Sequence, residues 1–145
     1  MTIKESIISI DGIDKTGKDS VRKLMIQMSG GKVLVKVRTF MSQIVYSRIY
    51  DRRIDEDFFI NKMLEYQKIG EKFFMLTCNN EVLRERFILS AEKDLKQEDI
   101  ETHQKIFNDV SQYMQGKGIH IITLDTSYDS VLETATHIFN SIENG

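Results

Sequence analysis

The sequence contains no proline and a single cysteine, and both features limit the structures that the chain can adopt. Cys78 alone cannot form a disulfide within the chain, so a disulfide framework is excluded and a reducing, cytoplasmic setting is expected. Without proline, the turns must be built from Gly, Asn, Asp and Ser. No apolar run approaches the roughly 18 residues that a membrane span needs. The first residues, MTIKES, lead directly into an apolar run, so we expect no signal peptide.

The bulk composition is that of an ordinary globular chain. Hydrophobic residues make up 41% of the 145 positions and charged residues 29%, which is typical of a soluble protein. A chain of this length can bury a sizeable core, and we treat residues 1–145 as one domain. The formal net charge is −2, so neither nucleic acid nor a membrane is an expected partner.

The most specific signal is the stretch IISIDGIDKTGKDS, residues 7–20. An apolar run of strand type leads into a turn bounded by Gly12 and Gly17, and Lys18 then opens a segment with helical spacing. Strand, glycine-bounded loop, lysine and helix in this order form a phosphate-binding loop. The glycines let successive N–H groups converge, the helix start adds its dipole, and the lysine reaches the outer phosphates. The loop residues expected to line a bound nucleotide are Gly12, Asp14, Thr16, Gly17, Lys18, Asp19 and Ser20.

The loop departs from the pattern G-x-x-x-x-G-K-[ST] at its last position. Asp19 stands where a hydroxyl residue would hold Mg²⁺, and Ser20 comes one residue too late. A carboxylate can bind Mg²⁺ directly, because hard oxygen ligands suit this ion, but it can equally repel a triphosphate. Two interpretations stay open: a nucleotide site with Asp19 as its metal ligand, and a glycine turn that binds nothing.

Hydrophobic periodicity beyond the loop predicts strands that alternate with helices. Apolar residues at i, i+3, i+4 and i+7 predict a helix over 18–28. Alternating valines predict a strand over 32–38, and the continuous apolar run KFFMLT over 72–77 predicts a strand covered on both faces. The other predicted elements are the strand that contains residues 7–10, a strand over 119–124, helices over 39–50, 57–69, 81–89, 100–115 and 130–142, and polar loops over 51–57 and 90–99.

This order of elements predicts the fold class α/β. We expect a three-layer α/β/α sandwich with a roughly four-stranded parallel sheet, of the P-loop NTPase type. Ligands of such sheets bind at the carboxyl ends of the strands. The loop and the residues after Val37, Thr77 and Leu124 should therefore surround one cleft. Phe58 and Val131 are among the apolar residues expected in the core.

These residues resemble the thymidylate kinase branch of the P-loop nucleoside monophosphate kinases. DGIDKTGKDS (11–20) is similar to the family's x-G-x-D-x-x-G-K-[ST]-[ST], with Asp14 in the extra acidic position. VRTFMSQIVY (37–46) resembles D-R-x-x-x-S-x-x-x-Y through Arg38, Ser42 and Tyr46. FFMLTCNNEVLRERF is similar to the strand and helix that lead into the family's lid, and HIITLDT to its adenine-side end. The lengths suggest a compact, divergent relative of a sort found in viruses.

The resemblance implies ATP-dependent phosphoryl transfer to a deoxynucleoside monophosphate such as dTMP, with ATP and Mg²⁺ as cofactors. It implies that Lys18 holds the donor phosphates and that Lys15 stabilises the transferring charge. It also implies that Asp14 contacts the acceptor sugar and Arg38 the acceptor phosphate, so that Lys15, Lys18 and Arg38 are the catalytic residues. The matching positions add Ser42 and Tyr46 to the acceptor site, and Arg84 and Lys93 on the lid side.

Two departures from the family affect the same metal ion. Asp19 replaces the hydroxyl ligand, and Val37 replaces the acidic partner of Arg38. The family's second strand also has no counterpart between Lys18 and Arg38. Each lost charge-stabilising group typically costs about 10²- to 10³-fold in rate. A second interpretation therefore stays open, a catalytically impaired, kinase-derived module that binds a nucleotide or another protein.

The remaining candidates carry weaker signals. Phe40 and Tyr46 lie where a base could stack. A homodimer is a further implication of the resemblance, and the 39–50 helix, apolar on more than one side, is where we expect its contact. Cys78 has no basic neighbour and is expected to be a small buried thiol. The histidines have no metal-ligand spacing; they are His103, His120 and His137.

Overall fold

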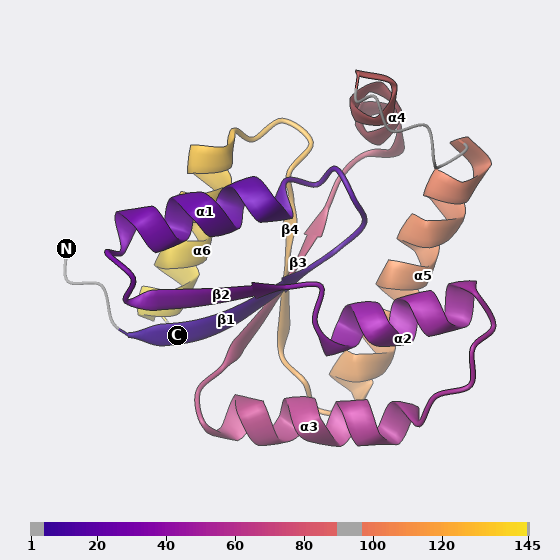
Figure 1. Ribbon diagram of the computed structural model, residues 1–145, viewed down its shortest axis with the longest axis horizontal. Coiled ribbons are helices and arrows are strands. Elements are labelled where there is room, and N and C mark those ends of the chain that lie inside the picture. Colours follow the sequence, from indigo (N-terminus) through magenta and orange to yellow (C-terminus); the bar gives the residue numbers. More distant parts are fainter. Residues whose placement is uncertain (1–4, 90–96, 145) are drawn as a thin grey trace.

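The computed structural model describes residues 5–89 and 97–144, which fold around a parallel sheet (Figure 1). Within these residues the strands lie in the order β2-β1-β3-β4, and each neighbouring pair is parallel. The strands are β1 (Ser6–Asp11), β2 (Val33–Val37), β3 (Lys72–Thr77) and β4 (Ile121–Asp125). The helices are α1 (Lys18–Met28), α2 (Phe40–Ile49), α3 (Glu56–Lys68), α4 (Asn80–Leu89), α5 (Gln97–Gly116) and α6 (Val131–Asn144).

Helices cover both faces of the sheet, which gives three layers (Figure 1). On one face α1 and α6 pack against the sheet, and on the other face α2, α3 and α5 do so. Strand β3 contributes to both cores, because Phe73 and Met75 point to one side and Phe74 and Leu76 to the other. The structure confirms the predicted α/β/α sandwich and the predicted strand with both faces covered. None of the helices within residues 5–89 and 97–144 is long and apolar enough to cross a membrane.

Most predicted boundaries agree with the structure to within about a residue, and three differ more. Helix α6 ends at Asn144, two residues beyond the predicted end at residue 142. Helix α5 begins at Gln97, inside the predicted loop over 90–99, whose first seven residues lie outside the described residues. Strand β4 begins at Ile121 instead of residue 119, because the N–H of Ile119 still donates to the α5 carbonyl of Met114 after the left-handed turn at Gly118.

Two side chains predicted in the core are partly exposed. Phe58 is 51% exposed, since its ring packs only at the surface, edge-on against Phe59. Val131 is 37% exposed, since it lines a pocket beside the glycine-bounded loop. Both predictions were wrong for the same physical reason. Each residue lies in the first turn of its helix, where periodicity gives the direction of a side chain but not the extent of the core.

Hydrogen bonds join the segments that follow neighbouring strands at the carboxyl edge of the sheet. The N–H of Thr39, after β2, donates to Asp11 at the end of β1 over 2.7 Å. The N–H of Thr126, after β4, donates to the carbonyl of Thr77 at the end of β3 over 2.8 Å. The loop of residues 12–17 leaves β1 at this same edge, so the segments that the sequence placed around one cleft do meet.

Candidate functional site

The loop of residues 12–17 turns sharply between β1 and α1, and two of its glycines are required by its geometry. Gly12 has a φ of 140°, and a Cβ there would lie 2.3 Å from the carbonyl oxygen of Leu76 in β3. Gly17 has a φ of 97° and precedes α1 in a left-handed conformation. No side chain of the described residues caps the start of α1. The first N–H groups of this helix therefore remain available to an anion.

Lys18, the first residue of α1, is folded back beneath the loop. Its side chain is only 2% exposed, and Nζ donates to the carbonyl oxygens of Gly12 at 2.6 Å and Ile13 at 3.0 Å. Burial lowers the pKa of Lys18 from 10.5 to about 8, and the nearby Asp14 carboxylate opposes this shift in part. The lysine is thus an ammonium group held by two carbonyls at the place where a phosphate-binding loop presents its charge.

Arg38 and Asp19 form a two-point ion pair at the mouth of the loop. Nη1 of Arg38 donates to Oδ1 of Asp19 at 3.2 Å, and Nη2 donates to Oδ2 at 3.0 Å. Asp14 lies 3.8 Å from the same guanidinium. The hydrogen bonds from Arg38 lower the pKa of the Asp19 carboxyl, and the pKa of Arg38 is raised in return. An open pocket of about 400 Å³ here is lined by Asp14, Lys15, Gly17, Lys18, Asp19, Ser20 and Arg38.

The carboxylates at this mouth fit Mg²⁺ only in the company of a polyphosphate. Asp14 and Asp19 are 53% and 58% exposed, and both oxygens of Asp19 face Arg38. In phosphoryl-transfer sites Mg²⁺ is held by one or two carboxylates together with substrate phosphates and water, which matches this donor set. Among the described residues, no group of three or more His, Cys, Asp and Glu forms a protein-only metal site. Asp19 therefore fits the metal role predicted for it once it is released from Arg38.

Asp11 supports the site from behind and was not identified from the sequence. Its carboxylate is buried and accepts four hydrogen bonds from the start of α2. The N–H and hydroxyl of Thr39 donate at 2.7 and 2.6 Å, and the N–H and hydroxyl of Ser42 donate at 3.3 and 2.7 Å. Ser42, predicted at the acceptor site, has a buried hydroxyl that donates to Asp11.

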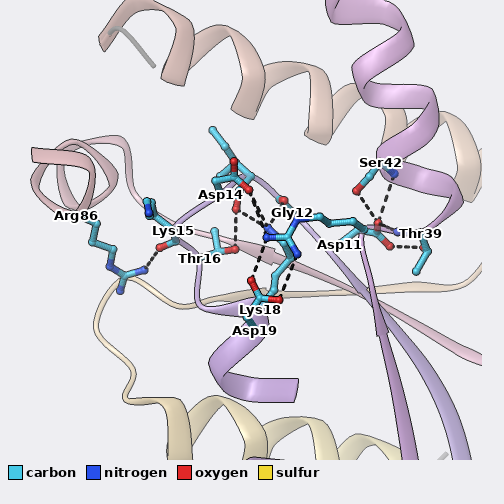
Figure 2. A network of polar contacts seen from close by, with 12 residues as sticks. Asp11, Gly12, Asp14, Lys15, Thr16, Lys18, Asp19, Thr39, Ser42 and Arg86 are labelled. Carbon is cyan, nitrogen blue, oxygen red and sulfur yellow. Dashed lines mark hydrogen bonds and ion pairs between the residues drawn. The ribbon is translucent and has the colours of Figure 1, made fainter. Parts of the chain in front are cut away.

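Arg86 of α4 ties the loop to the segment that follows β4. It donates to the carbonyl oxygens of Lys15 at 2.8 Å, drawn in Figure 2, and of Thr126 at 2.9 Å. The sequence-based choice for the lid side was Arg84, which instead pairs with Glu101 of α5. Residues two positions apart on a helix point about 200° away from each other, so only one of these arginines can face the loop.

A second pocket, of about 290 Å³, lies beside this arginine. It is lined by Lys15, Thr16, Gly17, Val21, Arg86, Thr126, Asp129, Val131 and Thr134. The hydroxyl of Thr126 donates to the carbonyl of Thr16 over 3.1 Å, which fixes the loop at the edge of the pocket. The site therefore consists of a charged mouth at Arg38 and a smaller pocket on the other side of the loop.

Other predicted residues lie close to the mouth but have packing partners of their own. Tyr46 meets Phe107 and His103 edge-on at 5.9 and 6.2 Å between ring centroids, and burial raises the pKa of its hydroxyl to about 12. The ring of Phe40 stacks on that of Tyr66 at 5.8 Å. Cys78 is buried, as predicted, and this burial raises the pKa of its thiol.

Two lysines complete the predicted set. Lys15 has a left-handed φ of 68°, and its Nζ lies 6.0 Å from the centroid of the Phe87 ring, between the mouth and the second pocket. Lys93, predicted on the lid side, lies outside the described residues.

Solved structures with the same architecture were found by comparison. The chain superimposes on the YorR protein of Bacillus subtilis, solved in complex with phosphorylated GDP, with a TM-score of 0.79 and 17% identity over 95% of this chain and 96% of that one. It also superimposes on thymidylate kinase from Candida albicans (TM-score 0.65, 12% identity, 99% and 93% of the two chains). Shikimate kinase from Bacteroides thetaiotaomicron gives a TM-score of 0.55 at 8% identity, over 95% and 98%.

No protein-family model matches the chain, and no curated protein matches it in sequence. The identities to the solved structures are low, so the likeness establishes the fold and nothing finer. The chain has the fold of these P-loop kinases, and its glycine-bounded loop joins β1 to α1.

Proposed function

We propose that the protein is a nucleotide kinase that transfers the terminal phosphate of a nucleoside triphosphate to a deoxynucleoside monophosphate such as dTMP. The observation that carries this proposal is the convergence of three cationic or N–H-bearing groups on one mouth. These are Lys18, Arg38 and the uncapped start of α1. Phosphoryl transfer requires mainly positioning and positive charge around the equatorial oxygens, and this mouth supplies both.

The donor triphosphate, ATP according to the family resemblance, would lie along the loop. Backbone N–H groups of residues 12–18 would bind its phosphates, and the ammonium of Lys18 would exchange the carbonyls of Gly12 and Ile13 for phosphate oxygens. Lys15, which borders both pockets, is placed to neutralise the transferring group. The YorR structure contains phosphorylated GDP, which supports a nucleoside polyphosphate as the ligand of this loop.

The acceptor monophosphate would bind on the Arg38 side of the mouth. The guanidinium of Arg38 would leave Asp19 and take the acceptor phosphate in the same two-point geometry. Asp14 would accept from the acceptor's sugar hydroxyl, and Tyr46 would form a wall of the acceptor site beside it. Mg²⁺, when bound with the donor by the freed Asp19, would supply charge neutralisation between the phosphates.

A second candidate function rests on the Asp19–Arg38 pair itself. As long as this pair is closed, the arginine is satisfied and the carboxylate repels phosphates, which is what an impaired kinase-derived binding module would show. The pair is about half exposed on both sides, so it is worth on the order of 1 kcal/mol or less, and a triphosphate can open it. We therefore favour the enzyme.

The experiment that tests this function measures nucleoside diphosphate formation by chromatography. Purified protein is incubated with Mg²⁺, ATP or GTP, and each of the four deoxynucleoside monophosphates in turn. We expect turnover with at least one acceptor, and its loss in Lys18→Ala. If no diphosphate forms with any acceptor, the enzyme function is contradicted and the binding module becomes the favoured function. Turnover that is unaffected by Lys18→Ala would indicate a contaminating kinase.

We also propose a homodimer, as the family resemblance implies, in which only a small part of the 39–50 segment contacts the partner copy. Met41, Ile44 and Val45 of α2 are buried in the same core as residues of α3 and α5, so most of this helix is covered within the chain. Tyr50, at its end, is 57% exposed and is the apolar part of the segment that a partner copy could cover. Analytical sedimentation of the wild-type protein and of Tyr50→Glu tests this proposal, since the wild type should sediment as a dimer and the variant as a monomer.

A further inference from the structure

The pocket beside Arg86 is placed to receive the base of the bound nucleotide. It shares Lys15 and Gly17 with the phosphate mouth, so the two pockets adjoin at the loop and one ligand can span both. Its volume of about 290 Å³ is at the lower end of ligand pockets, which suits one flat ring system. Which base this pocket selects is a question that rests on the proposed function.

Arg86 gives the pocket a flat cationic wall. Its two carbonyl partners, Lys15 and Thr126, belong to different segments and hold the guanidinium in one orientation. A fixed guanidinium plane is a good stacking surface for an aromatic ring. Val21 and Val131 add apolar lining, so the pocket accepts the faces of a base and leaves its edge to be recognised by polar groups.

Asp129 is the one carboxylate among the lining residues of this pocket. Its side chain is 28% exposed, and its nearest charged partner is His137, whose Nε2 lies 3.8 Å from Oδ2. That pairing requires a protonated imidazole, and none of the described residues donates a hydrogen bond to Asp129. The carboxylate therefore lies in the wall of the pocket without a hydrogen-bond donor among the described residues.

We propose that Asp129 makes the donor site selective for guanine over adenine. Guanine presents two adjacent donors, N1–H and the 2-amino group, which match the two oxygens of a carboxylate. Adenine presents one donor, its 6-amino group, beside the N1 acceptor, which the carboxylate repels. Since Asp129 is partly exposed, we expect a preference of about ten-fold, below that of a fully buried pair.

Calorimetric titration of the full chain with GDP, IDP and ADP, each with Mg²⁺, tests this selectivity. GDP should bind about ten-fold more tightly than ADP. IDP should be intermediate, because hypoxanthine keeps N1–H and lacks the 2-amino group. In Asp129→Asn one acceptor becomes a donor, so the affinities for GDP and ADP should converge.

Glu133→Gln is the matched control. Glu133 lies in the first turn of α6, outside the pocket, and its carboxylate accepts from the N–H of Ser130, an interaction that the amide oxygen of glutamine keeps. The GDP preference should remain in this variant. A preference lost equally in Glu133→Gln and in Asp129→Asn would assign the effect to the net charge of the segment and overturn the role of Asp129.

The outcomes separate this inference from the proposed function. Equal affinities for GDP and ADP in the wild type, tighter ADP binding, or an unchanged ratio in Asp129→Asn would overturn guanine selection and leave the kinase intact. Guanine preference without diphosphate formation would overturn the kinase and retain the base pocket. No binding of any of the three nucleotides would overturn both.

Discussion

The affinity for nucleotide should fall when the pH rises from 7 to 9, because Lys18 loses its proton in that range. In the free protein burial lowers the pKa of Lys18 to about 8. Phosphate oxygens next to Nζ favour the charged form, so the pKa of Lys18 must rise when a nucleotide binds. Binding is therefore coupled to proton uptake above pH 8, and the charged, binding-competent lysine becomes the minor species there.

The size of the effect follows from the pKa of about 8. The protonated fraction of Lys18 in the free protein is about 0.9 at pH 7, 0.5 at pH 8 and 0.1 at pH 9. The affinity at pH 9 should therefore be about ten-fold lower than at pH 7, and each nucleotide bound at pH 9 should take up about 0.9 proton.

Calorimetry in two buffers with different ionisation enthalpies measures both the affinity and the proton uptake. Lys18→Arg is the control, because its guanidinium stays charged over this pH range. Any ionisation of the nucleotide itself affects the binding to both proteins equally. The difference between the two proteins then belongs to Lys18. A wild-type affinity that is flat from pH 7 to 9, or binding without proton uptake at pH 9, would refute the assignment of Lys18 to the phosphates.

Three further substitutions test the supports of the loop. Asp11→Asn should lower the free energy of unfolding by about 3 kcal/mol in urea denaturation, because the buried carboxylate accepts four hydrogen bonds, whereas the exposed Asp57→Asn should change it by less than about 0.5 kcal/mol. Gly12→Ala places a methyl carbon 2.3 Å from a β3 carbonyl oxygen and should cost about 3 kcal/mol or more, whereas Gly116→Ala, with open space around it, should be neutral or stabilising; equal effects would contradict this. Asp19→Ser releases Arg38 and removes a charge, so metal-free ATP should bind about two- to five-fold more tightly in calorimetry, and unchanged or weaker binding would show that the ion pair does not compete with phosphate.

The fold could be predicted because its signals are local. Helix α1 lies over residues 18–28 as its apolar spacing predicts, and β3 over 72–77 as its continuous apolar run predicts. The loop that we propose to bind phosphate could be singled out for the same reason, since its glycines, its lysine and its flanking elements are contiguous in the chain. Where the loop meets β3, the close approach at Gly12 explains why that position has to be glycine.

The rest of the site depends on contacts between distant residues. Asp11 binds Thr39 and Ser42, which lie 28 and 31 positions away, and no local pattern marks that carboxylate. Arg86 was passed over for Arg84 because helical spacing does not tell which of the two faces the loop. Asp19 was recognised as an anomaly, but its pairing with a residue 19 positions away becomes visible only in three dimensions. Asp129 belongs to no sequence motif, and only its position in the lining of the pocket beside Arg86 makes it a candidate for base recognition.

A calorimetric titration with ATP and GTP, once with Mg²⁺ and once with EDTA, tests most directly the claim that this loop holds the phosphates of a nucleotide. It is carried out on the wild-type chain and on Lys18→Ala. The structure predicts binding that is stronger with Mg²⁺, because the carboxylates at the mouth fit the ion only together with a polyphosphate, and binding that is lost in Lys18→Ala. No binding in the wild type, or equal binding in both proteins, would contradict this account.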